Sequence, residues 1–223
     1  RFWPISKSAR PKQFLDVADT GETFIRQNYE RCLRIVPKDN VLIVTSVKYR
    51  QLVLEQIPDI KEENLLLEPY SRNTAPAVAY STYTLLKRDP EALVAIMPSD
   101  HIIDNDEVFS ETLDKAFRYV SENDVLMNLG IVGGREAYLS NEPLQIKTFT
   151  EKPDRTLAEV FISTGEFLWN AGIFLWKAKT ICKEMEKHTP EITTQFAGWE
   201  SAIGSRIEDE FIRRAYTGCP NIS

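Results

Sequence analysis

The sequence predicts an α/β fold with a mostly parallel central sheet and helices on both faces. Short aliphatic runs typical of buried strands alternate along the chain with amphipathic stretches of helical period. Parallel strands joined by helical crossovers are covered on both faces, which suits runs of this kind. The length of 223 residues allows one large domain or two small ones, and the hydrophobic share of 43 % favours a packed core over disorder.

Five apolar runs are expected to form the strands. The first three are 40–46 (NVLIVTS), 64–69 (NLLLEP) and 92–98 (ALVAIMP), which are rich in aliphatic residues. Further along the chain, 145–150 (QIKTFT) and 171–178 (AGIFLWKA) are interpreted as strands as well. The last of these is followed by charged sequence with helical character up to the final residues.

Three segments between the strands are expected to be helices. Residues 23–36 and 106–123 place their apolar side chains on one face at helical spacing. Residues 74–87 form a third candidate, with Asn73 as a plausible N-cap and Pro76 tolerated in the first turn. Strands and helices therefore alternate through the first half of the chain.

Composition excludes several classes of function. A formal net charge of −6 argues against nucleic acid as a partner but allows a local basic pocket for a small phosphate ligand. No apolar run approaches the roughly 18 residues of a membrane span, so no membrane partner is expected. Cys32, Cys182 and Cys219 are odd in number and far apart, which argues against disulfides or a zinc knuckle and favours a reducing cytoplasm.

Polar residues follow two of the predicted strands at the edge where α/β sheets bind ligands. Asp100 comes directly after 92–98, where a carboxylate can hold Mg²⁺ or simply cap a turn. Arg72, Asn73 and Thr74 lie between a strand and a helix N-terminus. Their amide and hydroxyl groups could hydrogen-bond to the edge of a nucleotide base, and the helix N-terminus favours an anion. Alternatively, Asn73 could act only as a helix cap.

A second set of polar residues lies in the later part of the chain. Glu151 and Lys152 follow 145–150, where the lysine suits a phosphate and the glutamate could hydrogen-bond sugar hydroxyls. The alternative is a surface ion pair of little energetic value. Asn170 precedes two small residues, which allow either close approach of a ligand or tight packing.

The order of these motifs is more specific than any one of them. The segments RFWPISKSARPKQFL, EPYSRNTAPAVA, MPSDHII, FTEKPD and WNAGIF together resemble the bacterial mannose-1-phosphate guanylyltransferases, which are sugar nucleotidyltransferases. The resemblance runs from residue 1 to the closing CPNIS. It implies a Rossmann-like nucleotide-diphospho-sugar transferase fold. It also implies a reaction of GTP with mannose 1-phosphate that gives GDP-mannose and pyrophosphate with Mg²⁺, in a cytoplasmic and possible homodimeric enzyme.

The resemblance assigns roles at the nucleotide side. Arg1 matches the end of a glycine-rich phosphate-binding loop, whose glycines would precede it, and Lys12 matches the lysine that meets the transferring phosphates. Both are therefore predicted to be catalytic. Asp100 matches the metal-binding aspartate, and 72–74 match the loop on the guanine side.

The resemblance also assigns roles at the sugar side. Glu151 and Asn170 match positions that contact the sugar, and Lys152 matches the lysine on the sugar phosphate. Residues 1–223 are thus expected to form a single nucleotidyltransferase catalytic domain that lacks its first and last segments.

Two departures from the family pattern accompany this resemblance. The Gly-Tyr-Gly-Tyr segment expected after the LGI run is missing, so we expect a loop absent from the sequence near Ile131–Val132. A second metal ligand and the C-terminal domain are expected beyond Ser223.

Two other hypotheses remain open at this point. One is a nucleotidyltransferase for another hexose 1-phosphate or another base. Mannose and glucose differ in the orientation of one hydroxyl, and a few residues can determine which of the two a site accepts. The other is a non-catalytic homologue that binds a sugar nucleotide and regulates a partner. Retention of Lys12, Asp100 and Lys152 together favours an enzyme.

Overall fold

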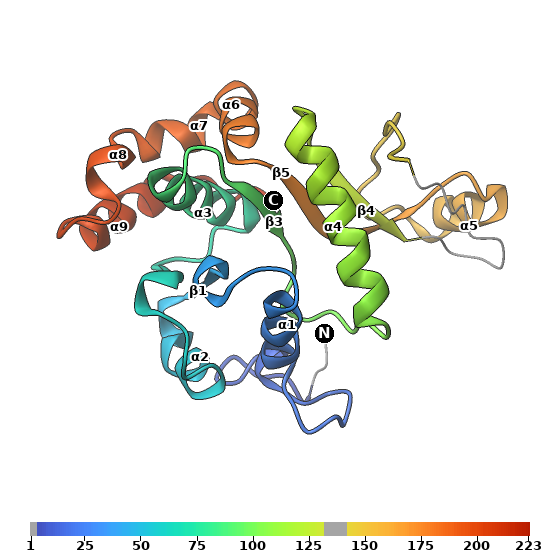
Figure 1. The fold of residues 1–223 in the computed structure, drawn as a ribbon, viewed down its shortest axis with the longest axis horizontal. Helices are drawn as coiled ribbons and strands as arrows, with labels where there is room; N and C mark the ends of the chain where they lie inside the picture. Colours follow the sequence, from blue (N-terminus) through green and yellow to red (C-terminus); the bar gives the residue numbers. More distant parts are fainter. Residues whose placement is uncertain (1–3, 132–141) are drawn as a thin grey trace. The chain divides into compact units, whose positions relative to one another are not determined.

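The computed structural model describes residues 4–131 and 142–223 (Figure 1). The chain divides into two compact units, of which the first comprises Arg1–Met127 and Leu175–Ser223 and the second Asn128–Phe174. The helices of the first unit are α1 (Phe24–Leu33), α2 (Arg50–Gln56), α3 (Thr74–Arg88), α4 (Asp106–Glu122), α6 (Ala178–His188), α7 (Pro190–Thr193), α8 (Trp199–Ala202) and α9 (Glu208–Gly218). The strands that lie wholly within this unit are β1 (Ile43–Ser46), β2 (Leu65–Glu68) and β3 (Leu93–Ile96).

The strands β1 and β2 form a parallel pair. Their register runs from Ile43 opposite Leu65 to Ser46 opposite Glu68, and α2 lies between them in the sequence. This confirms the predicted parallel direction of the two strands, whereas α2 was not among the predicted helices.

A second sheet has three strands in the order β3-β5-β4, with β4 at Met127–Ile131 and β5 at Trp169–Lys177. β5 belongs partly to each unit. Within the first unit, the N–H of Ala178 donates to the carbonyl of Ala92 over 2.9 Å. The end of β5 therefore lies beside the start of β3, as in antiparallel neighbours.

The predicted apolar faces of the helices form the core of the first unit. In α1, Phe24, Ile25 and Tyr29 are at most 5 % exposed, and in α4, Leu113 and Val120 are fully buried. A cluster of buried residues packs under β1 and β2; its members are Phe14, Ile25, Tyr29, Val41, Val53, Ile57, Ile60 and Leu65. Because these side chains leave water together, the hydrophobic effect fixes α1 and α2 against the strand pair.

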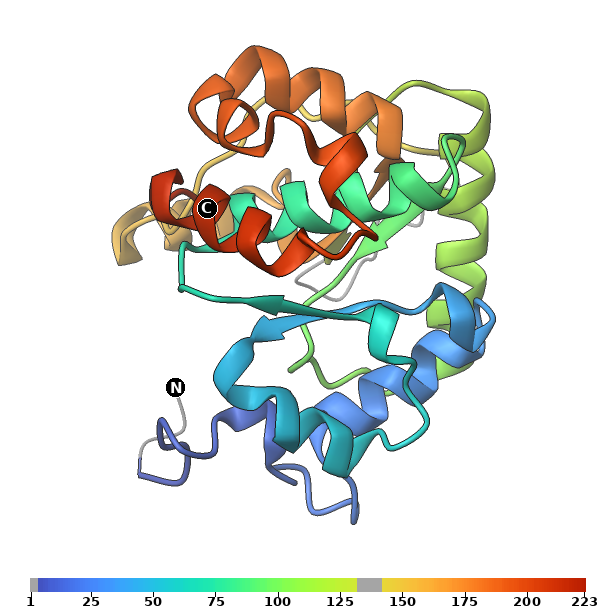
Figure 2. The ribbon, with the colours of Figure 1, turned by 90° about the vertical axis from the view of Figure 1, so that its left-hand side faces the viewer.

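The C-terminal helices pack around α3. α3 contacts α6, α7 and α8, and Figure 2 shows these helices lying along it. Aromatic rings fill the contact: Tyr83 stacks on Trp199 with centroids 5.0 Å apart, and Phe196 lies 6.1 Å from Tyr216. The helical sequence predicted after β5 is therefore confirmed, and its helices pack against α3.

In the second unit, one predicted strand is not formed. Residues 145–150 are described, yet they adopt no strand and all of them are exposed. A strand needs a paired neighbour, and an apolar–polar alternation does not supply one by itself. The helix that follows, α5 (Arg155–Thr164), begins at Asp154, whose carboxylate accepts from the N–H of Leu157, and ends at Gly165 with φ of 68°.

None of the helices in residues 4–131 and 142–223 is both long enough and apolar enough to cross a bilayer. Cys32, Cys182 and Cys219 are free thiols. The loop expected near Ile131–Val132 falls at the edge of residues 132–141, which lie outside the described part of the chain.

Candidate functional site

A single turn of 3-10 helix positions Lys12. The turn spans Lys12–Phe14, and Phe14 is 1 % exposed in the core, where its ring centroid lies 5.7 Å from that of Tyr49. Tyr49 also donates from its hydroxyl to the carbonyl of Ser8 over 3.1 Å. A buried anchor two residues away thus holds Lys12 in place while its own side chain stays 39 % exposed.

The loop after β3 positions Asp100 beside this lysine. The side-chain amide of Asn28 on α1 donates to the carbonyl of Pro98 over 2.6 Å, which ties the loop to the helix. The carboxylate of Asp100, 17 % exposed, forms an ion pair with the ammonium of Lys12. Two residues that were predicted separately from the sequence are therefore brought together.

The Lys12–Asp100 pair is suited to phosphate chemistry. A half-exposed ion pair contributes less than about 1 kcal/mol to folding, so stability is a weak reason for it. A lysine is a point charge that suits a phosphate, and a carboxylate suits a hard cation such as Mg²⁺. No cluster of three acidic, histidine or cysteine side chains that could hold a metal occurs among the described residues. One carboxylate still fits Mg²⁺, which is commonly bound by one or two carboxylates together with substrate phosphates and water.

The loop Arg72–Thr74 has an unusual backbone. Asn73 has φ of 61° and ψ of −156°, a region that almost only glycine adopts, and such strain is concentrated at functional sites. Asn73 occupies the N-cap position of α3, but within the described residues its side chain makes no capping hydrogen bond. The predicted N-cap position of Asn73 is therefore confirmed, but its side chain does not make the hydrogen bond typical of a cap. The side chain of Asn73 is exposed.

Two residues that the sequence analysis missed hold this loop. The guanidinium of Arg72 donates to the backbone carbonyl of Tyr216 on α9 over 3.1 Å. The hydroxyl of Tyr216 in turn donates to the carboxylate of Glu68, the last residue of β2, over 3.1 Å. Near the chain end, the N–H of Ala75 donates to the carbonyl of Ile222 over 3.1 Å. The position of Glu68 at the end of a predicted strand could have marked it as a candidate site residue. Nothing in the sequence marks Tyr216 in this way.

Burial changes the acidity of this pair. Burial raises the pKa of Glu68, and the hydrogen bond from Tyr216 opposes that rise. Burial is also the main cause that raises the pKa of Tyr216, with the negative charge of Glu68 as the next cause. Tyr216 therefore remains a neutral donor, and its hydrogen bond favours the ionised form of Glu68.

The predicted sugar-side residues belong to the second unit. Lys152 and Glu151 form an exposed ion pair of 2.7 Å, and Lys152 has a positive φ of 48°. The side-chain oxygen of Asn170 accepts from Asn128 over 2.7 Å and from the N–H of Gly172 over 2.6 Å. All three predicted side chains thus have a partner within this unit, and all three are exposed. The remaining predicted residue, Arg1, lies outside the described residues.

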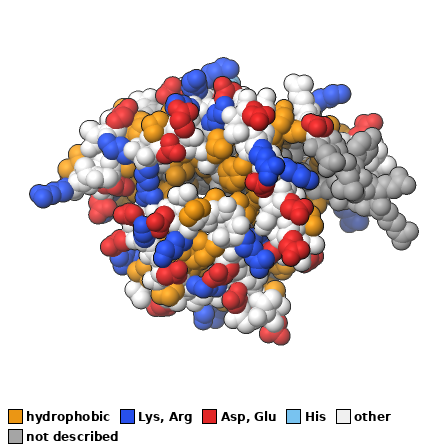
Figure 3. Space-filling model, in the orientation of Figure 1, with side chains coloured by type: hydrophobic (Ala, Val, Ile, Leu, Met, Phe, Trp, Pro, Cys, Tyr) orange, Lys and Arg blue, Asp and Glu red, His pale blue; other side chains and the backbone are white. Residues whose placement is uncertain are grey.

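Charges of both signs are mixed over the visible face. Figure 3 shows Lys and Arg side chains interspersed with Asp and Glu rather than gathered into one basic field. This mixing of charges agrees with the small net charge of −6.

Several curated relatives of this chain are mannose-1-phosphate guanylyltransferases. The chain is 31 % identical to the mannose-1-phosphate guanylyltransferase RfbM of Salmonella typhimurium over 241 residues, which cover 100 % of this chain and 49 % of that protein. The chain spans about half the length of the curated relatives it matches.

Two solved structures share the fold. One is the Thermus thermophilus protein described as mannose-1-phosphate geranyltransferase, with TM-score 0.80 and 26 % identity, covering 99 % of this chain and 64 % of the other. The second is the Helicobacter pylori protein described as mannose-6-phosphate isomerase, with TM-score 0.73 and 31 % identity over 89 % of this chain and 77 % of the other. The nucleotidyl transferase family model matches residues 1–201. The chain therefore belongs to the nucleotidyl transferase family.

Proposed function

We propose that the full-length protein transfers GMP from GTP to mannose 1-phosphate, giving GDP-mannose and pyrophosphate. The observation that carries this proposal is the Lys12–Asp100 ion pair after β3, in a chain of the nucleotidyl transferase family. The name of RfbM supports the mannose guanylyl branch. We place the activity in one catalytic domain that comprises residues 1–223.

The proposed reaction balances as a single displacement. An oxygen of the sugar phosphate forms a bond to the α-phosphorus of GTP, and the bond from that phosphorus to the bridging oxygen of the β-phosphate breaks. Pyrophosphate leaves with the electron pair. Such transfers need positioning and neutralisation of phosphate charge more than covalent help from the protein.

Lys12 supplies the positive charge at this step. Its ammonium is half-exposed and anchored through Phe14, so it can move from Asp100 to a phosphate without disturbing the core. There it would stabilise the negative charge that develops on the leaving pyrophosphate. Arg1, by its place in the sequence, is proposed to act on the same phosphates.

Asp100 is proposed to hold Mg²⁺ once Lys12 has turned to the phosphates. The ion, when bound, supplies further neutralisation of phosphate charge. The strained Arg72–Thr74 loop is proposed to contact the guanine, because the amide of Asn73 offers both a donor and an acceptor.

The sugar side is assigned to the second unit. Lys152 is proposed to bind the phosphate of mannose 1-phosphate, and Glu151 and Asn170 the sugar hydroxyls. The names of RfbM and of the Helicobacter pylori protein both include a mannose phosphate, which supports a hexose phosphate as one substrate.

The assay is pyrophosphate release by the full-length protein with paired substrates. Release is expected from GTP only when mannose 1-phosphate and Mg²⁺ are both present. Equal or faster turnover of UTP or dTTP with glucose 1-phosphate would reject the mannose assignment. Absence of turnover with every pair would favour the regulatory homologue.

The role of Lys12 is tested with a matched neighbour. Lys12→Ala is expected to lower kcat by about 100-fold or more with little change in the unfolding midpoint, because a half-exposed ion pair stabilises weakly. Lys7→Ala is the control, since Lys7 pairs with Arg10 through backbone hydrogen bonds that the substitution leaves intact. Near-normal turnover of Lys12→Ala would refute the catalytic role.

A further inference from the structure

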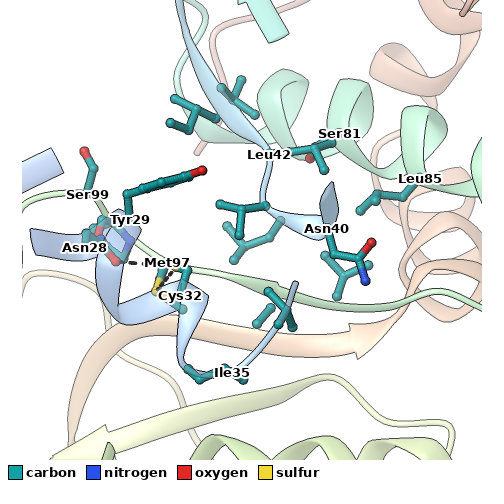
Figure 4. A pocket seen from close by; sticks show the side chains of 18 of the residues that line it. Asn28, Tyr29, Cys32, Ile35, Asn40, Leu42, Ser81, Leu85, Met97 and Ser99 are labelled. Carbon is teal, nitrogen blue, oxygen red and sulfur yellow. Dashed lines mark hydrogen bonds between the residues drawn. The ribbon is translucent and has the colours of Figure 1, made fainter. Parts of the chain in front are cut away.

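Helix α1 holds the start of the loop that carries Asp100. We refer to residues 97–105, which connect β3 to α4, as the Asp100 loop. The side-chain amide of Asn28 on α1 donates to the carbonyl of Pro98 in this loop over 2.6 Å. In Figure 4, Asn28 lies beside Met97, the first residue of the loop. The Asp100 loop is therefore bonded to α1 close to the point where it leaves β3.

Arg31 holds the other end of the Asp100 loop. It follows Asn28 at the i, i+3 spacing and therefore lies on the same face of α1. Its Nε donates to the carboxylate of Asp106, the first residue of α4, over 2.7 Å. Its guanidinium carbon also lies 5.9 Å from the centroid of the Phe109 ring on α4. One face of α1 thus fixes the loop at both ends, and Figure 2 shows the start of α4 (green) beside α1 (blue).

Stability alone is a weak reason for a buried arginine at this position. The side chain of Arg31 is only 4 % exposed, and its Nη1 is buried with no hydrogen-bond partner in the described part of the chain. Removing a guanidinium from water is costly, and well-packed apolar residues in place of a buried ion pair often leave a protein equally or more stable. The bond to Asp106 does fix where α4 begins, because a hydrogen bond restricts both the distance and the direction between its partners.

The same helix supports Lys12. Phe14, which shares a 3-10 turn with Lys12, packs in one buried cluster with Ile25 and Tyr29 of α1. Both partners of the Lys12–Asp100 ion pair are therefore positioned relative to α1. Their separation depends on α1 holding both the turn of Lys12 and the Asp100 loop.

We propose that Arg31 is a positioning residue for the proposed metal and phosphate site. By fixing Asp106 against α1, Arg31 restrains the end of the Asp100 loop and so holds the carboxylate of Asp100 opposite Lys12. Arg31 touches no substrate and acts only through the loop. The inference rests on the proposed roles of Lys12 and Asp100. Residues that orient a metal ligand in this way typically change metal affinity about 10- to 100-fold when they are replaced.

Metal binding by variants of the full-length protein tests the proposal. The probe is Mn²⁺, titrated into protein with GTP at constant concentration and without sugar phosphate, and measured by the electron paramagnetic resonance signal of free Mn²⁺. Arg31→Met keeps a long side chain and removes the charge, and it is expected to weaken Mn²⁺ binding about 10-fold. In pyrophosphate release, the apparent constant for Mg²⁺ is expected to rise by the same factor, while the KM for mannose 1-phosphate stays unchanged.

Arg34→Met is the matched control. Nη2 of Arg34 lies 3.7 Å from the other carboxylate oxygen of Asp106, but the side chain of Arg34 is 57 % exposed. The control therefore removes the same charge near the same carboxylate without removing a buried contact. Arg34→Met is expected to bind Mn²⁺ as the unchanged protein does. Equal weakening by Arg31→Met and Arg34→Met would mean that only the charge matters and would overturn the positioning role.

A double variant separates positioning from stability. Arg31→Met leaves Asp106 without its buried partner and is expected to lower the unfolding midpoint. Arg31→Met combined with Asp106→Asn removes both charges, so part of the midpoint is expected to return while Mn²⁺ binding stays about 10-fold weaker. Recovery of Mn²⁺ binding together with the midpoint would mean a structural role only and would refute the proposal.

Asp100→Asn separates failure of this inference from failure of the proposed function. Weaker Mn²⁺ binding in Asp100→Asn but not in Arg31→Met would overturn the role of Arg31 alone. Unchanged Mn²⁺ binding in Asp100→Asn would withdraw the proposed metal role of Asp100, and the role of Arg31 with it.

Discussion

Removing one hydroxyl from Tyr216 tests the link between α9 and the loop of Arg72. The hydroxyl donates to the carboxylate of Glu68 over 3.1 Å, and Tyr216 is fully buried. A hydrogen bond to a charged group is worth about 1.5–3 kcal/mol, and its loss leaves the half-buried carboxylate of Glu68 without this donor. We therefore expect Tyr216→Phe to lower the free energy of unfolding by about 1.5–3 kcal/mol, since the ring itself is retained.

A second tyrosine provides a matched control. Tyr80 donates to the carboxylate of Glu208 over 2.8 Å, but Glu208 also accepts from the N–H of Gly204 over 2.7 Å. Water and that second donor can compensate for the lost hydroxyl. Tyr80→Phe is therefore expected to cost about 0.5–1.5 kcal/mol, the range of an ordinary hydrogen bond.

The pH dependence gives the comparison a second readout. Burial raises the pKa of Glu68, so the folded protein binds its proton more tightly than the unfolded chain does. Stability associated with Glu68 is therefore lost as the pH rises through this raised pKa, and the hydroxyl of Tyr216 reduces the loss. The penalty of Tyr216→Phe should be largest above that pKa and shrink as the pH falls through it.

The assay is urea denaturation of the full-length protein followed by tryptophan fluorescence at several pH values. Equal costs for Tyr216→Phe and Tyr80→Phe, or a Tyr216→Phe penalty that does not change with pH, would refute the assigned role of Glu68.

Three further substitutions follow from the site. Asn73→Gly should keep or raise the unfolding midpoint, because it relieves a positive φ, while it raises the KM for GTP; a lower midpoint would contradict the strain. Asn28→Ala should destabilise by about 0.5–1.5 kcal/mol in urea and weaken the apparent affinity for Mg²⁺, since the loop of Asp100 loses its bond to α1; unchanged Mg²⁺ dependence would contradict this. Phe14→Ala should cost about 3–5 kcal/mol in the same measurement, and a loss below 1 kcal/mol would mean that Phe14 does not anchor Lys12.

Local pattern was enough to predict most of the first unit. The aliphatic runs around β1, β2 and β3 and the apolar faces of α1 and α4 depend on neighbours in the sequence, and all were predicted correctly. Lys12 and Asp100 were each predicted as site residues, but their ion pair was not predicted, because Lys12 follows no strand in the described part of the chain.

Features that depend on distant residues could not be predicted in this way. The bond from Tyr216 to Glu68 joins positions 148 residues apart, and no local pattern marks either partner for the other. Asn73 has the residue type of a helix cap, but its positive φ is not marked by the neighbouring sequence, and the adjacent Arg72 is bonded to a residue 144 positions away. The run 145–150 has the composition of a strand, and whether it pairs depends on a neighbour that the run itself does not specify.

The hold of α9 on the Arg72 loop has a consequence for the order of folding during synthesis. Lys12 and Asp100 are both made well before Tyr216, and the bond from Arg72 to Tyr216 closes a span of 144 residues. Contacts of such sequence separation form late, because the intervening chain must be ordered before they repay the entropy of closure. A nascent chain can therefore complete the proposed phosphate site of Lys12 and Asp100 while the loop proposed for the base is still unsupported. Nucleotide would then bind tightly only after α9 has docked and its bond to Arg72 holds the loop.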